Sequence, residues 1–550
     1  MTTPHPHEIE LKLALPPGQA EAFLKRMARR RTLKGTSSTP VQMDLVTRYF
    51  DTPDFALSAE GVALRVRRAG RRWLQTLKTE GERQGGLSRR AEFEMPVTRG
   101  ELDWTRFPAV ALAYVPDALR TQVVPVFETH FRRTAWLLKG KAGAQIEVAL
   151  DVGEVRTPKG MNAGERSQPI CEIELELKSG QPDALFALAL EWAGAFDCLP
   201  FDISKAERGV RLAHGVADEP VKAVPLELDD GMSVEDGFAE IVQNCLAQFQ
   251  ANLPGVLSSD DIEYVHQARV ALRRLRAALR LMRKACALPD ELLDGLRTLA
   301  AALGPARDWD VLCGETLPAI APHYPDQNAW QHGMQALELR RTEVRAAMQD
   351  ALTQARPGAW LLALQRWLLQ RGWRLSPNGG VSPSGESVPE AQRFVQLSPL
   401  DAWARRALQK GHRPIVRGAR NFGKLAPAQR HALRIAIKRQ RYAAEFFQTL
   451  FGAHPEGHQR RQGRYLDMLR NAQDSLGRAN DAHIAWGLLT AAHTTPHVLQ
   501  NVVDRSPLGQ VKSGPMGDFV LGWLAAKQAE AASGESARRV RAFLKLKAYW

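Results

Sequence analysis

The 550-residue sequence is short of cysteine and of long apolar runs, and each shortage excludes a class of protein. Its five cysteines are scattered with no paired spacing, which argues against a disulfide framework and a zinc site and favours a reducing compartment. No stretch of about 18 or more uncharged apolar residues occurs, so we expect no membrane span. The start, MTTPHPHEIELKL, has no apolar core behind a basic flank and is not a signal peptide, so we predict a cytoplasmic protein.

Positive charge is in excess, and it is unevenly distributed. The formal net charge is +14, with 44% hydrophobic and 24% charged residues, which is a globular composition. Residues 1–215 hold 31 Lys and Arg against 27 Asp and Glu, whereas residues 216–550 hold 43 against 33. The first part is mixed in sign, as a site that handles both anions and cations would be, and the second part suits a polyanionic partner.

The segment HEIELKL at 7–13 has a near copy, CEIELELK, at 171–178. Successive side chains of a β-strand point to opposite faces, so charged residues gather on one face of each segment and Ile and Leu on the other. The charged faces hold Glu8, Glu10, Lys12, Glu172, Glu174 and Glu176. A half-buried strand with its polar side in water alternates in the same way, and for either segment alone that alternative stays open.

A period of two dominates from residue 7 to about 213. The pattern predicts strands at 8–15, 41–50, 63–69, 72–79, 87–97, 126–138, 144–155 and 170–177, and helices at 18–29 and 181–193. Eight strands that are polar on one face and apolar on the other fit a closed antiparallel β-barrel with a polar interior and flanking helices.

The polar faces of these strands carry both acids and bases. They hold Glu8, Glu10, Lys12, Arg65, Arg67, Lys78, Arg90, Glu92, Glu94, Arg132, Glu147, Asp151, Glu172 and Glu174. So many charges inside a barrel need counter-ions, because desolvating them unpaired is very costly. The basic residues suit an oligophosphate as their counter-ion. The paired carboxylates suit a hard cation such as Mg²⁺ or Mn²⁺. That combination suits phosphoryl transfer.

At these motifs the sequence resembles the CYTH superfamily, the triphosphate tunnel metalloenzymes. HEIELKL matches its ExExK signature, and the segments at 49–68, 73–79, 172–178 and 204–209 follow in the family's order. The resemblance implies metal ligands at Glu8, Glu10, Glu147, Asp151, Glu172 and Glu174. It implies catalytic roles for Lys12, Glu92 and Glu94, and phosphate contacts from Arg65, Arg67, Lys78, Arg90, Arg132 and Lys205. The choices of Arg132 over Arg133 and between Glu147 and Asp151 depend on strand register.

From about residue 232 the apolar period becomes helical, as at 233–253, 263–282 and 290–303. HQARVALRRLR at 266–276 aligns with HALRIAIKRQR at 431–441, and related segments that we expect to be loops follow at 303–310 and 476–483. Such a repeat implies an all-α domain of two pseudo-symmetric helical bundles. The expected domains are a tunnel domain at 1–215, a linker at 216–231, a helical domain at 232–520 with a polar insertion at about 376–396, and a helical tail at 521–550.

Each copy of the repeat carries one basic stripe at helical spacing. The stripes are His266, Arg269, Arg273 and Arg276 in the first copy, and His431, Arg434, Lys438 and Arg441 in the second. A single basic stripe is usually a solvated face, whereas a duplicated stripe led by His favours a phosphate contact or simple packing. Metal ligation is disfavoured because neither stripe has a second His at i+4. The rival polyanion, nucleic acid, is disfavoured because no recognition helix, zinc-finger spacing or interleaved aromatics accompany the stripes.

With ARDWDVL and RANDAH, residues 232–520 resemble the CHAD domain, a histidine-bearing helical module often fused behind a CYTH domain. The resemblance implies binding of inorganic polyphosphate and suggests an association with polyphosphate granules. Our leading hypothesis is a metal-dependent inorganic triphosphatase that hydrolyses tripolyphosphate to pyrophosphate and phosphate, with a polyphosphate-binding helical domain. The alternatives are thiamine triphosphatase or class IV adenylate cyclase activity in the same tunnel, or a non-catalytic polyphosphate-binding scaffold. The sequence leaves the oligomeric state open.

Overall fold

The chain consists of two compact units. The computed structural model describes residues 7–34, 39–140, 143–157, 165–374, 390–451, 456–493, 515–531, 534–546 and 548–550. Residues 1–219 and 356–370 make up the barrel unit, and residues 220–355 and 371–550 make up the helical unit. The polar stretch predicted as an insertion lies outside the described residues, apart from 390–396, which are helical.

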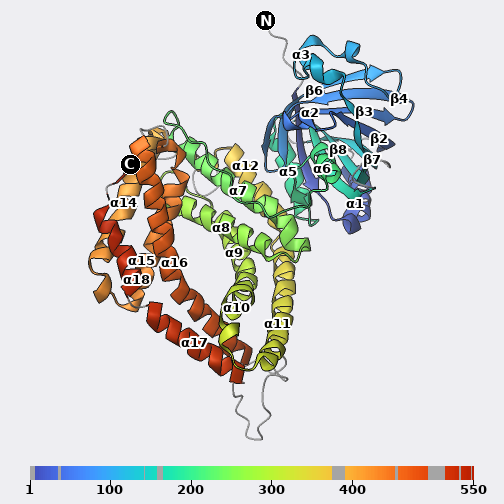
Figure 1. Ribbon diagram of the computed structural model, residues 1–550. Helices are drawn as coiled ribbons and strands as arrows, with labels where there is room; N and C mark the ends of the chain where they lie inside the picture. Colours follow the sequence, from blue (N-terminus) through green and yellow to red (C-terminus); the bar gives the residue numbers. More distant parts are fainter. Residues whose placement is uncertain are drawn as a thin grey trace. The chain divides into compact units, whose positions relative to one another are not determined.

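Eight antiparallel strands of the barrel unit close into a barrel (Figure 1). Their order is β1-β9-β8-β7-β2-β3-β4-β6, and β6 pairs again with β1, which closes the circle. They are β1 (His7–Ala14), β2 (Val41–Asp51), β3 (Ala63–Ala69), β4 (Arg72–Lys78), β6 (Leu87–Val97), β7 (Val124–Lys139), β8 (Gln145–Arg156) and β9 (Ser167–Ser179). Two short strands, β5 (Glu82–Gln84) and β10 (Leu199–Pro200), pair with β6 and β1. The eight predicted strands and the barrel are confirmed.

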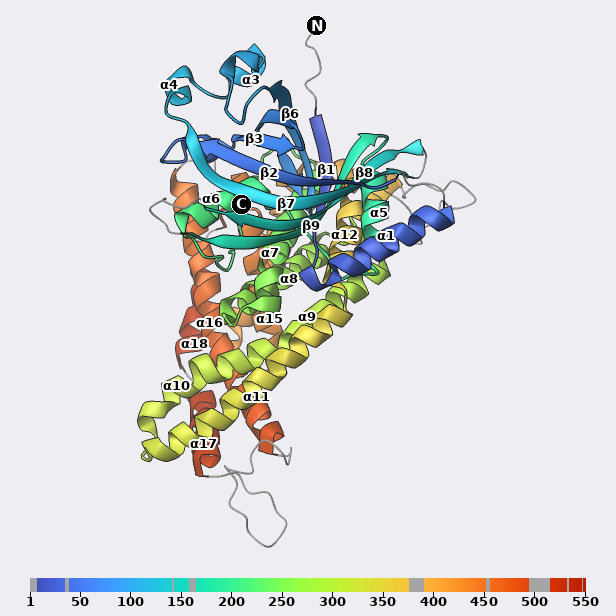
Figure 2. The same ribbon diagram turned by 90° about the vertical axis from the view of Figure 1, so that its right-hand side faces the viewer.

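Helices cover part of the outer face of the barrel (Figure 2), and this explains why the strands alternate so strictly. Side chains such as Leu11 and Leu175 point outward and pack against α1 (Ala20–Lys34) and α5 (Asp183–Ala193). Phe23 of α1 and Trp192 of α5 meet edge to face in this layer, with ring centroids 5.1 Å apart. The apolar residues form the core outside the barrel, so the polar residues are directed inside. The helices predicted at 18–29 and 181–193 are α1 and α5.

One helix of the barrel unit comes from far along the sequence. α12 (Pro357–Leu369) contacts α5 and β10, although the sequence predicted that these residues belong to the helical domain. Leu362 is fully buried in the apolar layer outside the barrel. Arg366 donates two hydrogen bonds to Asp183, of 2.6 and 2.7 Å. The barrel unit therefore includes part of the chain that follows residue 355.

The remaining helices of the barrel unit are short. They are α2 (Ala56–Ala59), α3 (Ala109–Leu112), α4 (Asp117–Arg120) and α6 (Lys205–His214). α6 begins with a capping box, in which Ser204 accepts from the Glu207 amide and Glu207 accepts from the Ser204 amide. This cap fixes Lys205 as the first residue of the helix. Lys205 is the α6 residue that the sequence predicted as a phosphate ligand.

The helical unit contains the basic repeat in two equivalent settings. α8 packs with both α7 and α9, and α15 packs with both α14 and α16, while α8 and α15 also contact each other. The helices are α7 (Val234–Ser258), α8 (Ile262–Met282), α9 (Asp290–Val311), α10 (Leu317–Ile320), α11 (Gln327–Gln354), α13 (Glu390–Leu397), α14 (Leu400–Arg420), α15 (Pro427–Phe446), α16 (Glu456–His493), α17 (Pro515–Ala531) and α18 (Gly534–Arg541). The segments 303–310 and 476–483 lie inside α9 and α16, so the prediction of loops there is wrong. Gly304 and Pro305 disfavour a helix by intrinsic propensity, and α9 continues through both.

All five cysteines are free. Within the described residues, no helix is long and apolar enough to cross a membrane.

We expect Leu362→Ala to destabilise the full-length protein by about 2–5 kcal/mol, because it leaves a cavity in the layer between α12 and the barrel. Leu369→Ala on the same helix is the matched control, since Leu369 is 46% exposed and its truncation should cost less than about 0.5 kcal/mol. Calorimetric melting of the two variants tests the docking of α12. Equal melting temperatures would show that α12 does not stabilise the barrel.

Candidate functional site

The inward faces of the strands form a tunnel in which opposite charges meet. Its lining includes Glu8, Glu10, Lys12, Tyr49, Arg65, Arg67, Lys78, Arg90, Arg133, Glu147, Glu174, Glu176 and Lys205. These side chains contact one another so closely that the free volume between them is only about 60 Å³. A ligand must therefore replace existing ion pairs when it enters.

Three carboxylates on one side of the tunnel come close enough to share a cation. Asp151, Glu172 and Glu174 each place an oxygen within 4.8 Å of the other two. Asp151 and Glu172 are almost completely buried. They come from β8 and β9, where Asp151 is the direct cross-strand partner of Glu172. Three oxygen donors of this kind are a ligand set that Mg²⁺ and Mn²⁺ prefer.

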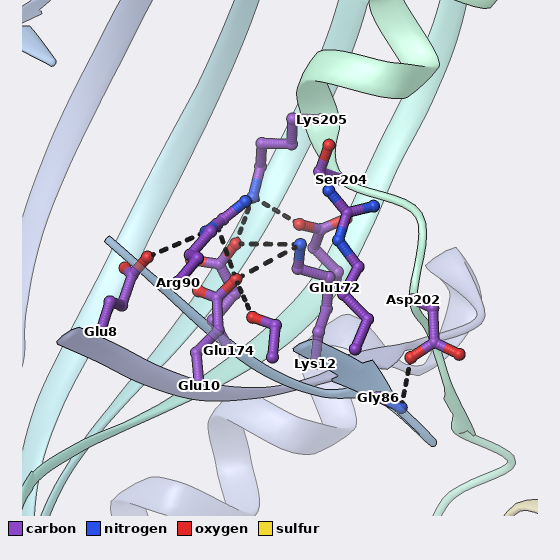
Figure 3. A network of polar contacts seen from close by, with 12 residues as sticks. Glu8, Glu10, Lys12, Gly86, Arg90, Glu172, Glu174, Asp202, Ser204 and Lys205 are labelled. Atoms are coloured by element: carbon purple, nitrogen blue, oxygen red, sulfur yellow. Dashed lines mark hydrogen bonds and ion pairs between the residues drawn. The ribbon is translucent and has the colours of Figure 1, made fainter. Parts of the chain in front are cut away.

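Lys205 and Arg133 neutralise these three carboxylates in the structure. The Lys205 ammonium group lies 2.7 Å from Asp151 and 2.8 Å from Glu174. It also contacts Glu172 (Figure 3). Arg133 donates to both oxygens of Asp151, at 2.7 and 2.6 Å, and to Glu174. Burial alone would raise the pKa of Glu174, but Lys205, Arg133 and Lys12 hold it well below its usual range. The Glu174 carboxylate is therefore ionised and able to bind a cation.

A second pair of acids lies on β1, the strand that pairs with β9. Glu8 accepts a 2.6 Å hydrogen bond from Lys78, and Glu10 accepts a 2.9 Å hydrogen bond from Arg90. Arg90 also donates to Glu8, at 3.3 Å. Lys12 connects the two acidic groups, because its ammonium group lies 3.8 Å from Glu10 and 3.9 Å from Glu174.

Close packing at a hairpin fixes the position of Lys12. Its amide donates to the Gly86 carbonyl at 2.8 Å, and its carbonyl accepts from the Phe201 amide at 3.0 Å. The Gly86 amide donates to Asp202, at 2.6 Å (Figure 3). Gly86 has a φ of +87°, and a Cβ there would lie 2.8 Å from the Lys12 carbonyl oxygen, so glycine is required. This contact ties β1 to the segment that leads into α6.

Farther along the tunnel, the charges of two arginines of β3 are compensated to different degrees. Arg67 donates a 3.0 Å hydrogen bond to the Thr47 hydroxyl, and it has no carboxylate partner among the described residues. Burial, together with the charges of Arg65 and Arg133, lowers the pKa of Arg67 to about 10. Arg65 contacts Glu92 at 3.4 Å, and the negative groups around it raise its pKa against the effect of burial. Burying the charge of Arg67 without a carboxylate is costly, so this part of the tunnel favours an anion.

The basic stripes of α8 and α15 face each other in the helical unit. Burial and the charges of four arginines from both helices lower the pKa of Lys438 to about 8. These arginines are Arg273, Arg434, Arg441 and Arg269. The Nε atoms of Arg273 and Arg434 are buried without a hydrogen-bond partner in the described structure. Half-buried bases from two helices thus gather in one place, which also favours an anion.

α9 adds a residue to this basic group that the sequence did not single out. Arg307 lies in the ARDWD segment, and burial followed by the charge of Arg307 lowers the pKa of His266. Asp308 in the same segment lies 3.9 Å from Arg269, and Asp310 accepts a 2.9 Å hydrogen bond from Arg341. The segment therefore supplies both a base and the acids that hold neighbouring arginines. Its charge pattern could have indicated this, had the segment been assigned to a helix.

Comparisons with known families agree with this geometry. The CYTH domain model matches residues 6–210, and the CHAD domain model matches residues 240–490. The chain is a CYTH domain fused to a CHAD domain.

Among curated proteins, the chain is similar to the inorganic triphosphatase of Haemophilus influenzae, with 34% identity over 212 residues. That alignment covers 37% of this chain and 54% of the relative. An uncharacterized protein of Mycobacterium tuberculosis is 28% identical over 299 residues, which cover 51% of this chain and 54% of the relative. The chain thus spans about half the length of the curated relatives it matches.

Two solved structures correspond to the two domains. The crystal structure of the CHAD domain from the plant Ricinus communis has 29% identity, covers 60% of this chain and 97% of its own, and gives a TM-score of 0.47. A putative adenylyl cyclase from Hippeastrum, described as having a dominant triphosphatase activity, has 17% identity. It covers 38% of this chain and 97% of its own, with a TM-score of 0.26.

Most residues predicted for the CYTH site lie in or beside the tunnel. They are Glu8, Glu10, Lys12, Arg65, Arg67, Lys78, Arg90, Glu92, Glu147, Asp151, Glu172, Glu174 and Lys205. Glu147 and Asp151 both face inward, but Glu147 is partly exposed and pairs with Lys178 at 3.9 Å. Glu94 is exposed, accepts from Thr76 at 3.3 Å, and is not part of the tunnel lining.

The prediction of Arg132 is wrong, because Arg133 is the tunnel residue. Arg132 is exposed on the outer face and donates to Asp44 at 2.9 Å. Arg132 and Trp136 are an even number of residues apart on β7, so their side chains point to the same face. Trp136 packs into the outer apolar layer. The position of Trp136, four residues from Arg132 and three from Arg133, is the sequence signal that could have settled the register.

The predicted CHAD stripes are only partly brought together. Arg441 is near Lys438, but it also pairs with Glu445 at 3.0 Å and donates to Gln473 at 2.9 Å. Arg276 and His431 are exposed on their helices. The basic group of the CHAD domain therefore consists of His266, Arg269, Arg273, Arg307, Arg434 and Lys438, with Arg441 at its edge.

We expect Arg133→Gln to lower the free energy of unfolding by about 3 kcal/mol, because it removes a cation from the buried Asp151 and Glu174. Arg132→Gln should lower it much less, because the ion pair of Arg132 with Asp44 is exposed. Denaturant melts of the two variants measure the difference. A larger loss for Arg132→Gln would contradict the register described for β7.

Proposed function

We propose that the CYTH domain is a metal-dependent inorganic triphosphatase, which hydrolyses tripolyphosphate to pyrophosphate and phosphate. The observation that carries the proposal is the placement of Arg67. It is a buried guanidinium group without a carboxylate partner among the described residues, inside a closed tunnel that also holds a three-carboxylate cluster. A compact polyanion, bound together with divalent cations, satisfies both groups.

The phosphate oxygens would be bound by the arginines and lysines that are now paired with tunnel acids. Arg67 supplies charge that is largely uncompensated. Arg65, Arg133 and Lys78 can exchange a carboxylate for a phosphate at similar cost. Bidentate guanidinium contacts fix the orientation of the chain, which is the main requirement for phosphoryl transfer.

The acidic residues fit a divalent metal by their number, their chemistry and their spacing. Asp151, Glu172 and Glu174 would hold it, and Glu8 and Glu10 of the neighbouring strand β1 would add further oxygen ligands. A bound Mg²⁺ or Mn²⁺ would neutralise the charge that develops on phosphate oxygens. Lys205 now occupies this region as the counter-ion, so it is free to turn to a phosphate oxygen once the carboxylates have another cation.

Lys12 and Glu92 are the residues placed to handle protons. Lys12 lies between Glu10 and Glu174, so its ammonium group is close to where phosphate oxygens would lie and can donate to them. Glu92 is ionised, because Lys78 and Arg65 lower its pKa against the effect of burial, so it can accept a hydrogen bond from the attacking water. Glu94 is not part of the proposal, because it is exposed.

The H. influenzae relative, called an inorganic triphosphatase, supports this function over the alternatives. A thiamine triphosphatase or an adenylate cyclase would need contacts for an organic group, and a scaffold would not need the buried acids. The ratio of kcat/KM values for tripolyphosphate, thiamine triphosphate and ATP decides between the enzymatic readings.

We expect the full-length protein to release phosphate from tripolyphosphate with Mg²⁺ or Mn²⁺ and to lose this activity with a chelator. Glu10→Gln and Glu174→Gln should each lower kcat at least about a hundredfold. Glu128→Gln is the matched control, because Glu128 is an outward-facing, ion-paired acid of β7. Absence of hydrolysis with both metals would refute the proposed activity and leave the scaffold reading.

We further propose that the CHAD domain binds inorganic polyphosphate through the basic group on α8, α9 and α15. The supporting observation is that half-buried bases from separate helices lie close together. Their burial and mutual repulsion cost free energy, and a bound polyanion would remove this cost. A cytoplasmic location and an association with polyphosphate granules remain predictions.

α14 offers an internal control for this binding surface. Five of its bases form an exposed stripe at the same helical spacing, and none has an ion pair with a described residue. They are Arg406, Lys410, Arg413, Arg417 and Arg420. They differ from the proposed surface in that they come from one helix and are fully exposed to water, which already solvates their charges.

Changing Arg269, Arg273, Arg434 and Lys438 to Gln should weaken binding of long-chain polyphosphate. The slope of log affinity against log salt should also fall, by roughly one for each residue that contacts phosphate. Changing Arg406, Arg413, Arg417 and Arg420 to Gln removes the same charge and should have the smaller effect. Titrations at several salt concentrations measure both. Equal losses in the two variants would show that net charge alone binds the polyanion.

A further inference from the structure

A chamber adjoins one mouth of the CYTH tunnel. It has a volume of about 280 Å³, and its wall includes residues of α2, the β4–β5 turn, β5 and α6. It shares Ala63, Lys78, Arg90, Ser204 and Ala206 with the wall of the tunnel. A ligand that fills the tunnel can therefore continue into the chamber.

The tunnel leads away from this chamber along β3. Ala63 is at the shared wall, and Arg65 and Arg67 are the next inward-facing residues. Inward positions of a strand are about 7 Å apart, so Arg67 lies about 14 Å along the strand from the chamber. A phosphate chain whose end is bound by Arg67 would have its other end directed toward the chamber.

The chamber has cations of its own. Arg83 of β5 and Arg211 of α6 line it, in addition to Lys78 and Arg90 at the shared wall. Arg83 pairs with Glu207 at 2.6 Å, and Arg211 pairs with Asp218 at 3.3 Å. Both pairs are partly exposed, so an arriving phosphate can take over either guanidinium group at little cost.

Two acids, Glu80 and Glu207, also line the chamber, so its four bases outnumber its acids. The other wall residues are small or aliphatic, and no described residue that lines the chamber is aromatic. Ala59, Gly61, Val62 and Val210 leave the space open without offering a flat ring surface. An adenine or thiazole ring would have nothing to stack on, whereas a flexible chain of phosphates needs only cations and room.

On the basis of the proposed function, we propose that the chamber holds phosphate units beyond the third, so that the tunnel shortens inorganic polyphosphate from its end. A water oxygen bonds to the terminal phosphorus, and the bond from that phosphorus to the bridging oxygen breaks. The terminal unit leaves as orthophosphate, the shortened chain keeps the bridging oxygen, and the proton of the water is released. No other reactant is needed.

Purified full-length protein is assayed with tripolyphosphate and with linear tetrapolyphosphate, with the activating metal present, and early products are separated by anion chromatography. We expect tetrapolyphosphate to yield orthophosphate and tripolyphosphate first. The double variant Arg83→Gln and Arg211→Gln should lower the kcat/KM ratio of tetrapolyphosphate to tripolyphosphate about tenfold. Ala59→Trp, which fills part of the chamber, should lower the same ratio.

Arg48→Gln is the matched control, because Arg48 is an ion-paired arginine on the outer face of the barrel. The CHAD domain is the same in all variants, so its own binding of phosphate chains cancels in the ratio. The inference is overturned if tetrapolyphosphate is not cleaved, if it splits into two pyrophosphates, or if the chamber variants leave the ratio unchanged.

A failure of the proposed function is a separate outcome. If tripolyphosphate is not cleaved, the proposed triphosphatase activity is wrong. The chamber is then tested by measuring the affinities of tripolyphosphate and tetrapolyphosphate. Tetrapolyphosphate should then bind more tightly than tripolyphosphate to the wild type and lose this advantage in the double variant. Equal affinities in the wild type would overturn the chamber as a phosphate site.

Discussion

The constraint on which this structure depends is the cost of holding charge inside a barrel. Apolar residues on alternate positions of eight strands pack outward, which forces the charged positions inward. Each inward acid is then satisfied by a base from another strand or from α6, as Lys205 does for the three-carboxylate cluster. Arg67 has no such carboxylate partner among the described residues, and this is where a polyanion is favoured.

A tunnel that is already neutralised internally changes the energetics of binding. A ligand does not add its contacts to an empty cavity, because the space among the side chains is only about 60 Å³. It exchanges one set of ion pairs for another. The carboxylates that lose their lysine and arginine partners need cations in return, so anion and divalent metal are expected to bind together.

The sequence predicted the barrel because a period of two depends only on which positions are apolar, and this can be read from the residues. It assigned the inward faces of β1, β3 and β9 correctly for the same reason. It misplaced Arg132 because two adjacent arginines both fit a polar face, and only the outward packing of Trp136 fixes the parity. It missed the contact of α12 with the barrel because a tertiary contact over more than 150 residues leaves no periodic signal.

The stripes on α8 and α15 and the stripe on α14 have the same helical spacing, so spacing alone could not separate them. What separates them is burial and convergence, which arise only when helices pack. The ARDWD segment shows the same limit. Its small residues are compatible with a turn, and only packing within α9 makes it helical and places Arg307 near His266.

The late position of α12 in the sequence has a consequence for synthesis. All eight strands of the barrel leave the ribosome by residue 179, but the helix that completes their outer layer ends at residue 369. At a translation rate of about 5–20 residues per second, the barrel waits roughly 10–40 seconds with Leu362's site uncovered. A nascent chain with such an apolar surface is a natural client for a chaperone.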